Sequence, residues 1–179
     1  MNTHQKTAAV SSRMLSRFRG EGSLLPPKAP IRVVFLAWFG GVITMSALSG
    51  LTLLTATPLV LGSFGATCVL VFAYPDVPFS QPRNILLGHL LSSLTGLVFL
   101  AVFGPHWWVV GIATGTSIAL MMLTRSVHPP AGSNPVIVFL YHPSWSFILY
   151  PTLVGVLMII IVAMLYNNAT RSSGYPRYW

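Results

Sequence analysis

The feature that most constrains this chain is a series of long apolar runs that carry almost no charge. Four runs approach or exceed the roughly 20 residues that a helix needs to cross a bilayer, and they are 33–55, 84–103, 107–124 and 147–167. Hydrophobic residues make up 54% of the 179-residue chain and charged residues only 7%, whereas about a quarter of residues are charged in soluble domains. A water-soluble core could not bury so much apolar surface. The sequence therefore predicts an all-α integral membrane protein.

Two shorter apolar stretches, 59–74 and 130–141, carry Gly, Pro and Ser or Thr at their starts, where a regular helix would be interrupted. Interrupted backbone at membrane depth is tolerated only inside protein or beside a water-filled cavity. We therefore expect a helical bundle of four full transmembrane helices plus two broken or half-spanning helices.

An offset of 67 positions aligns the two halves of the chain. The aligned identical pairs are Gly65/Gly132, Val69/Val136, Val71/Val138, Phe72/Phe139, Tyr74/Tyr141 and Gly88/Gly155. Chance similarity between apolar segments is the alternative, and the Gly and Tyr matches favour a repeat. If each half crosses the membrane three times, the second is upside down, as in many transporters. We expect two inverted three-element repeats, 33–103 and 104–168, with tails at 1–32 and 169–179.

The basic residues are distributed as membrane orientation requires. Ten Lys and Arg stand against two acidic residues, and with the basic 1–32 tail in the cytosol, Arg83, Arg125, Arg171 and Arg177 all fall on the cytosolic side. The opposite loops carry no Lys or Arg, so this charge does not indicate nucleic-acid binding. We expect a multi-pass protein of a bacterial inner membrane with both termini cytoplasmic. A transit peptide is the alternative for the tail, in which an amphipathic patch around residues 14–18 could rest on lipid.

The segment His128-Pro-Pro-Ala-Gly-Ser-Asn-Pro135 is the most informative part of the sequence. Its first two prolines lack the amide hydrogen that a helix needs and force a break after His128. Asn134 is a strong N-cap and Pro suits the first helical position, so the short helix 135–141 should begin inside the membrane. In the first half, Gly62-Ser-Phe-Gly-Ala-Thr67 occupies the matching place, with Thr67 as the expected cap.

Two half-helices that start near the midplane from opposite sides would aim free amides and positive dipole ends at one point. This arrangement favours an anion without a buried Lys or Arg, which would cost about 2.5 to 3.5 kcal/mol at the bilayer centre. The candidate substrate-binding residues are Ser63, Gly65, Ala66, Thr67, His128, Gly132, Ser133 and Asn134. The alternative is that these small residues only let helices pack closely.

Two further residues, His89 and Arg125, are candidates for gating or a proton relay. His128 could donate to an anion, shuttle protons or contact a backbone carbonyl, and the sequence leaves these roles open. His89 is a weaker relay candidate, since a buried hydrogen-bonded histidine is its simpler interpretation. Arg125 could attract anions at the cytosolic mouth or anchor a helix end.

Other polar residues argue for no further chemistry. Cys68 is the only cysteine, so no intramolecular disulfide and no cysteine-based metal site can form. His106 and His142 lie in predicted external loops without a carboxylate beside them, and we expect no metal or cofactor there. Asp76 is expected to pair with Arg83 across a loop. No nucleophile elbow, P-loop or zinc-helix motif occurs, so we expect no enzyme.

The His128-Pro-Pro-Ala-Gly-Ser-Asn-Pro segment, the Gly-Ser-Phe-Gly-Ala-Thr segment and the Gln81-Pro-Arg-Asn loop together resemble the HPP family of small integral membrane proteins. The resemblance covers residues 31–168. Members from cyanobacteria and plant chloroplasts are associated with nitrite transport, which the resemblance implies for this chain. Some relatives carry a soluble domain after the membrane part, so we expect this chain to be the transport unit alone.

We therefore expect a membrane transporter or channel for a small monovalent anion, above all nitrite. The lipid bilayer is the other expected partner, and association of copies into a homo-oligomer is open. The alternative function is a non-transporting membrane scaffold or assembly subunit, in which the small residues serve helix contacts.

Overall fold

The computed structural model describes residues 24–179, and residues 24–30 are extended without regular secondary structure. Most of the predicted basic tail, including the amphipathic patch around residues 14–18, lies outside the described residues. Residues 31–179 form one compact unit. Every regular element in the described part of the chain is a helix, which confirms the all-α prediction.

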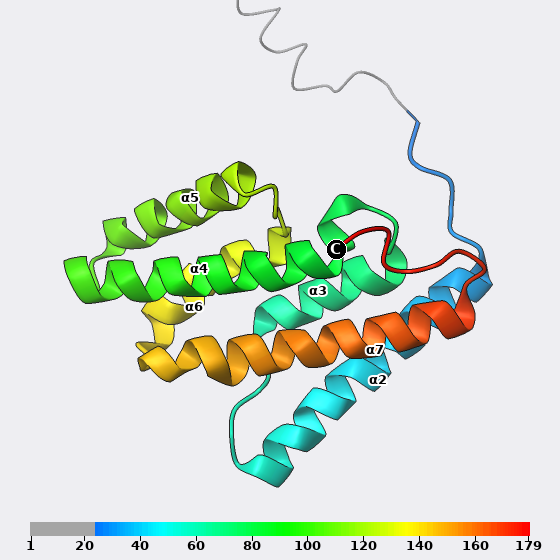
Figure 1. The fold of residues 1–179 in the computed structure, drawn as a ribbon, viewed down its shortest axis with the longest axis horizontal. Coiled ribbons are helices and arrows are strands. Elements are labelled where there is room, and N and C mark those ends of the chain that lie inside the picture. The colour runs from blue at the N-terminus through cyan, green and yellow to red at the C-terminus, as the bar shows by residue number, and fades with distance from the viewer. Residues whose placement is uncertain (1–23) are drawn as a thin grey trace, which may run out of the picture. The chain divides into compact units, whose positions relative to one another are not determined.

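Six α-helices and four short helical turns make up this unit (Figure 1). The α-helices are α2 (Ile31–Thr55), α3 (Gly62–Ala73), α4 (Pro82–Phe103), α5 (Trp107–Leu123), α6 (Asn134–Tyr141) and α7 (Val154–Thr170). The turns are η1 (Pro78–Ser80), η2 (Pro129–Ser133), η3 (Trp145–Ile148) and η4 (Leu149–Leu153), of which η4 is π-helical and the others are 3₁₀-helical.

Proline and glycine set several of these boundaries. Pro82 stands at the first position of α4, where its missing amide hydrogen costs nothing. Gly104 ends the same helix with a φ of 75°, a backbone conformation that side-chain-bearing residues rarely adopt. Helix α5 ends before Arg125, which takes a left-handed conformation with φ 53° while the N–H of Ser126 donates to the carbonyl of Met121. Pro129 and Pro130 then begin the tight turn η2.

Three helical stretches are long and apolar enough to cross a membrane. They are Ile31–Thr55, Pro82–Phe103 and Trp145–Thr170, with 25, 22 and 26 residues. The third joins η3, η4 and α7 across a kink at Tyr150, whose backbone is non-helical with φ −127° and ψ 116°. The apolar helices α3 and α5 are shorter, with 12 and 17 residues. The existence and approximate bounds of the predicted helices are confirmed, whereas the division into four full and two half-spanning elements stays a prediction.

Helix α4 occupies the centre of the unit. It contacts α5, α6, η2 and α7, while α2 packs against α3 and α7 (Figure 1). Glycines in α4 permit the close approach of the broken segment. A Cβ atom added to Gly88 would lie 2.8 Å from the Cβ of His128, and one added to Gly96 would lie 2.9 Å from the Cα of Pro135. The two glycines thus let η2 and α6 lie directly on α4.

A second close approach involves Gly155, the residue that the 67-position offset aligns with Gly88. A Cβ atom there would overlap the ring of Phe64 in α3. Each aligned glycine therefore lies where one half of the chain presses on the other. This reciprocity agrees with the expected repeat, although the inverted arrangement itself stays a prediction.

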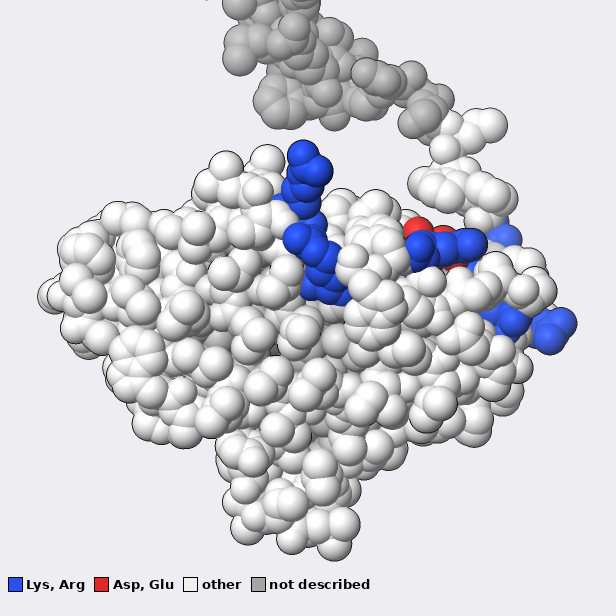
Figure 2. All heavy atoms as spheres, in the orientation of Figure 1, with Lys and Arg blue, Asp and Glu red and all other residues white. Residues whose placement is uncertain are grey.

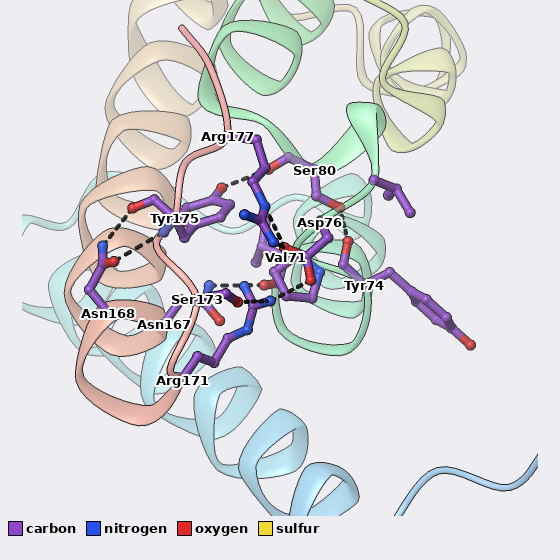
Figure 3. Close-up of polar contacts among 12 residues, drawn as sticks. Val71, Tyr74, Asp76, Ser80, Asn167, Asn168, Arg171, Ser173, Tyr175 and Arg177 are labelled. Atoms are coloured by element: carbon purple, nitrogen blue, oxygen red, sulfur yellow. Dashed lines mark hydrogen bonds and ion pairs between the residues drawn. The ribbon is translucent and has the colours of Figure 1, made fainter.

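The segment that follows α7 folds back onto the loop between α3 and α4 (Figure 3). The Tyr175 hydroxyl donates to the carbonyl of Ser80 at 2.6 Å, and the backbone N–H of Arg177 donates to the side chain of Gln81 at 2.7 Å. The Asn168 side chain accepts from the backbone N–H of Tyr175 at 3.0 Å. Burial raises the pKa of the Tyr175 phenol. Residues 171–179 are therefore tied to the loop that begins α4.

The predicted pairing of Asp76 with Arg83 is wrong. Asp76 forms ion pairs with Arg171 and Arg177, the latter at 2.8 Å, so its partners come from the segment after α7 (Figure 3). Arg83 instead donates to the carbonyls of Thr124 and Arg125, at 3.0 and 2.7 Å. Backbone carbonyls at the end of a helix such as α5 lack partners within the helix. They therefore accept hydrogen bonds from the guanidinium of Arg83, for which Asp76 was the expected partner.

The charged side chains of the unit lie near one margin of the face shown in Figure 2. Blue basic atoms and the red carboxylate gather along its upper and right-hand edge, and the rest of this face carries neither. A protein with one charged margin and a wide uncharged surface is suited to a bilayer, where charge belongs at the interface.

Candidate functional site

A cluster of polar side chains lies in the interior, where α3, α4, η2, α6 and η4 approach one another. Each of its members has a relative exposure of 0%, and they are Thr67, His89, Ser93, His128, Asn134 and Thr152. We call this set the polar cluster. Polar groups are buried at this depth only when they are hydrogen-bonded to one another, so the contacts within the cluster determine its chemistry.

His128 is held at the break that its two following prolines create. Its backbone is extended, with φ −136° and ψ 97°, and η2 begins at the next residue. Its Nδ1 lies 2.6 Å from the carbonyl oxygen of Phe79, and its Nε2 lies 2.9 Å from Oγ1 of Thr67. Because a carbonyl only accepts, Nδ1 carries the proton and Nε2 is left as an acceptor for the Thr67 hydroxyl. Of the roles expected for His128, contact with a carbonyl is confirmed.

His89 reaches the same hydroxyl from α4. Its Nε2 lies 3.1 Å from Oγ1 of Thr67, and its Nδ1 lies 3.1 Å from the amide nitrogen of Asn134. Because that amide nitrogen only donates, Nδ1 of His89 accepts and Nε2 carries the proton. The ring packs edge-on against Phe64 and lies 5.0 Å from the ring of His128. Both histidines are therefore neutral, with opposite tautomers.

Asn134 joins the histidines to a pair of hydroxyls. Its amide nitrogen donates to Oγ of Ser93 at 2.9 Å, and that hydroxyl lies 3.1 Å from Oγ1 of Thr152. The amide oxygen of Asn134 is buried without a hydrogen-bond partner, and so is the hydroxyl of Ser63. Such unpaired atoms are uncommon in protein interiors and mark places where a ligand or water can bind.

The predicted capping roles of Asn134 and Thr67 are wrong. Ser133 occupies the N-cap position of α6 without a side-chain cap, and the N–H of Asn134 already donates to Ala131 because η2 winds into the helix. Helix α3 begins at Gly62, so Thr67 lies in its second turn, where its hydroxyl is 2.9 Å from the carbonyl of Ser63. The 3₁₀ turn η2 thus supplies hydrogen-bond acceptors for backbone N–H groups that we expected to be free.

The expected convergence of two helix N-termini at one point stays a prediction. Thr67, in the second turn of α3, and Asn134, the first residue of α6, both contact the ring of His89. Helix α3 also packs against η2, the turn that leads into α6. The N-terminal half of α3 is thus joined to the start of α6 through His89.

The structure places the candidate residues of the sequence in two groups. Thr67, His89, His128 and Asn134 come together in the polar cluster. The others form no side-chain hydrogen bond to it: Ala66, Ser133 and Arg125 are exposed, Gly132 is half-buried and Gly65 lines a hollow beside α2. Ser63 is buried one turn before Thr67 and contributes its backbone carbonyl, which accepts from the Thr67 hydroxyl. The backbone carbonyl of Arg125 accepts from Arg83, and both roles expected for the Arg125 side chain stay predictions.

Sequence reasoning missed Phe79, Ser93 and Thr152. Phe79 acts through its backbone carbonyl, for which the sequence carries no signal. Ser93 lies four residues after His89 on the same face of α4, so its spacing in an apolar helix could have identified it. Thr152 lies in η4, within the fourth apolar run, where the neighbouring Pro151 is the signal that could have marked a break in the helix.

The fold and the cluster define a class of protein: an all-helical membrane protein with a hydrogen-bonded polar interior and charge confined to one margin. The HPP transmembrane-region family matches residues 26–176, and the chain belongs to this family. A Dictyostelium discoideum transmembrane protein is 35% identical over 164 residues, covering 87% of this chain and 58% of the relative. A second from the same organism is 32% identical over 170 residues, covering 88% and 55%.

The chain thus spans little more than half of the length of these curated relatives. No solved structure matches it significantly. The family places the protein in a membrane with transmembrane helices, and the prediction of HPP membership from the His128-Pro-Pro segment is confirmed.

Proposed function

We propose that this protein carries a small monovalent anion, above all nitrite, across the membrane, and that the anion passes through the polar cluster. The observation that supports this best is the set of hydrogen-bond donors buried in an otherwise apolar interior. Two imidazoles, the hydroxyls of Thr67 and Ser93 and the amide of Asn134 all lie there. Donors of this kind can replace the water that an anion loses on entering a membrane protein.

The lack of acidic groups supports an anion in preference to a cation. Asp76 is the only acidic residue among residues 24–179, and it lies in a loop, half exposed and paired with two arginines. Cation pathways in membranes are lined by carboxylates or rings of carbonyls. In the described part of the chain, no carboxylate is available in the cluster to repel an anion.

Because Thr67 and Asn134 do not cap free helix ends, we expect the side chains of the cluster to supply the anion's contacts. The unpaired hydroxyl of Ser63 lies one turn before Thr67 on the same face of α3 and extends the set of donors. The cluster is closed on all sides in this structure, since its members have no exposed surface. Transport therefore requires a movement, for which the proline-interrupted segment between α5 and α6 is the natural place.

The scaffold alternative also has an observation in its favour. Nearly all polar atoms of the cluster find partners within it, as they would if the cluster served only to hold α3, α4 and α6 together. In that case the protein would fold and insert normally but move no solute. We propose no enzymatic activity, and we place both termini on the cytoplasmic side of the expected bacterial inner membrane. Association of copies of this protein into a homo-oligomer is compatible with this proposal.

Nitrite uptake into proteoliposomes tests the proposal. Asn134→Leu removes the buried amide at similar size and should reduce uptake strongly, whereas Ser133→Ala, at the exposed neighbour, should leave it unchanged. Parallel assays with nitrate, formate and chloride establish the preference. If folded, correctly inserted wild-type protein admits no more nitrite than protein-free vesicles, the transporter proposal fails and the scaffold is favoured.

A further inference from the structure

An anion in the polar cluster faces a problem of charge. The groups that face the cluster are hydroxyls from α3 and η4, serines and His89 from α4, His128 before η2 and the amide of Asn134 from α6. The nearest contributions of α5 are Met121, beside Ser92, and a serine that bonds its own helix. No Lys, Arg, Asp or Glu in the described chain is hydrogen-bonded to these groups. Among the described residues, the two histidines are therefore the only titratable groups of the cluster, so only they can pass on a proton that balances the anion's charge.

The histidines are joined by a hydrogen-bond chain with a single sense. The Asn134 amide donates to Nδ1 of His89, Nε2–H of His89 donates to Oγ1 of Thr67, and Thr67 O–H can donate to Nε2 of His128. Nδ1–H of His128 then donates to the carbonyl of Phe79. Thr67 is the link between the rings, with its oxygen 3.1 and 2.9 Å from the two Nε2 atoms.

We infer that the protein carries one proton with each anion, along the chain from His89 through Thr67 to His128. The inference rests on the proposed function, since it names the co-substrate of the same site. A proton that arrives at Nδ1 of His89 releases the proton on Nε2 to Oγ1 of Thr67, whose own proton passes to Nε2 of His128. The proton on Nδ1 of His128 is released to water beside the loop that holds Phe79, since the carbonyl of Phe79 accepts a hydrogen bond but does not take up the proton. One proton enters this path of hydrogen bonds and one leaves it, so neither the histidines nor Thr67 keep a charge.

After this transfer, the chain of hydrogen bonds cannot carry a second proton at once. Nδ1–H of His89 then faces the donor nitrogen of Asn134, and the bare Nδ1 of His128 faces the carbonyl of Phe79. A half-turn of the Asn134 amide presents its oxygen to His89, and that oxygen is the buried atom that has no partner in this structure. The unpaired oxygen can thus stabilise the new tautomer of His89, and the transfer must be reversed, or the rings must turn over, before the hydrogen bonds can carry a second proton.

The carbonyl of Ser63 provides a place for the chain to be broken. It lies 2.9 Å from Oγ1 of Thr67, so the hydroxyl hydrogen can point either to that carbonyl or to His128. In the first orientation the path between the rings is interrupted, and in the second it is complete. A residue without a hydroxyl at position 67 should therefore interrupt it permanently.

The experiment uses proteoliposomes that contain a pH indicator, with an inward nitrite gradient and no initial pH gradient. Nitrite entry and internal acidification are measured together, and protein-free vesicles correct for undissociated acid that crosses lipid. We expect one proton to accompany each anion, and we expect a potassium diffusion potential to leave the rate unchanged because the pair is neutral. Nitrite entry without acidification, driven by the potential, would overturn this inference and leave the proposed function standing. No nitrite entry overturns both.

A matched pair of variants tests whether the hydroxyl of Thr67 connects the two histidines. Thr67→Val has the same shape without the hydroxyl and should lower acidification by about tenfold or more, whereas Thr67→Ser keeps the hydroxyl and should retain it. Helix content and thermal unfolding in detergent confirm that both variants are folded. If folded Thr67→Val acidifies vesicles as well as Thr67→Ser, the path does not run through this residue and the inference is wrong.

Discussion

Substitution of Gly88 by Ala tests both the packing of the broken segment and the position of His128. The added Cβ would lie 2.8 Å from the Cβ of His128 and 3.3 Å from the carbonyl oxygen of Ser126. The first distance is 0.6 Å less than the 3.4 Å at which ordinary contact begins. Neither neighbour is the free end of a flexible side chain, so the segment before η2 must move. Overpacking of this kind costs about 1 to 3 kcal/mol.

The same displacement should act on the polar cluster. His128 meets Thr67 at 2.9 Å, and a shift of about half an ångström takes that contact toward the limit of a hydrogen bond. Gly88→Ala should therefore lower both the unfolding free energy in mixed micelles and the rate of nitrite uptake. Gly115→Ala is the matched control, since nothing lies within 4 Å of an added Cβ at that position of α5. Equal stability and equal uptake in the two variants would refute the packing described for Gly88.

The remaining predictions concern the charged margin. Tyr175→Phe removes the bond to Ser80 and should lower the unfolding free energy by about 0.5 to 1.5 kcal/mol, measured by thermal or denaturant unfolding. Burial raises the pKa of Tyr175 above its usual value of 10.0, so the folded protein holds this proton more tightly than the unfolded chain. Stability should consequently fall as the pH rises above about 10, and Tyr175→Phe should flatten that fall; an unchanged slope would contradict it. Arg83→Gln loses contacts with the carbonyls of Thr124 and Arg125 and should cost about 1 to 3 kcal/mol, whereas Arg83→Lys should restore part of the loss.

The positions of the helices could be predicted because apolar run length and proline act locally. Helix α4 begins at Pro82 and α5 ends just before the break at His128, within a few residues of the expected bounds. The 3₁₀ turn η2 could not be predicted, because whether the chain between Pro129 and Asn134 coils or opens depends on the surface of α4 beneath it. The conformation of η2 determines whether the backbone amides at the start of α6 are free to bind a ligand.

The candidate site was predicted in part, and for a partly mistaken reason. Thr67 and Asn134 were selected as helix caps, whereas the structure joins them through the ring of His89. What brings them together is the packing of α3 and the broken segment on α4, which a single sequence does not encode visibly. The partners of Asp76 illustrate the same limit, since Arg171 lies 95 positions further along the chain.

The fold of the last nine residues has a practical consequence. Tyr175 and Arg177 hold Ser80 and Gln81, the two residues that follow Phe79, whose carbonyl fixes the tautomer of His128. A purification tag or fluorescent fusion attached after Trp179 would disturb this segment and, through the loop that contains Phe79, the polar cluster. Preparations intended for transport assays should therefore carry their tags at the other terminus. A probe placed on Trp179, which is 69% exposed, could in turn report from the surface when the interior rearranges.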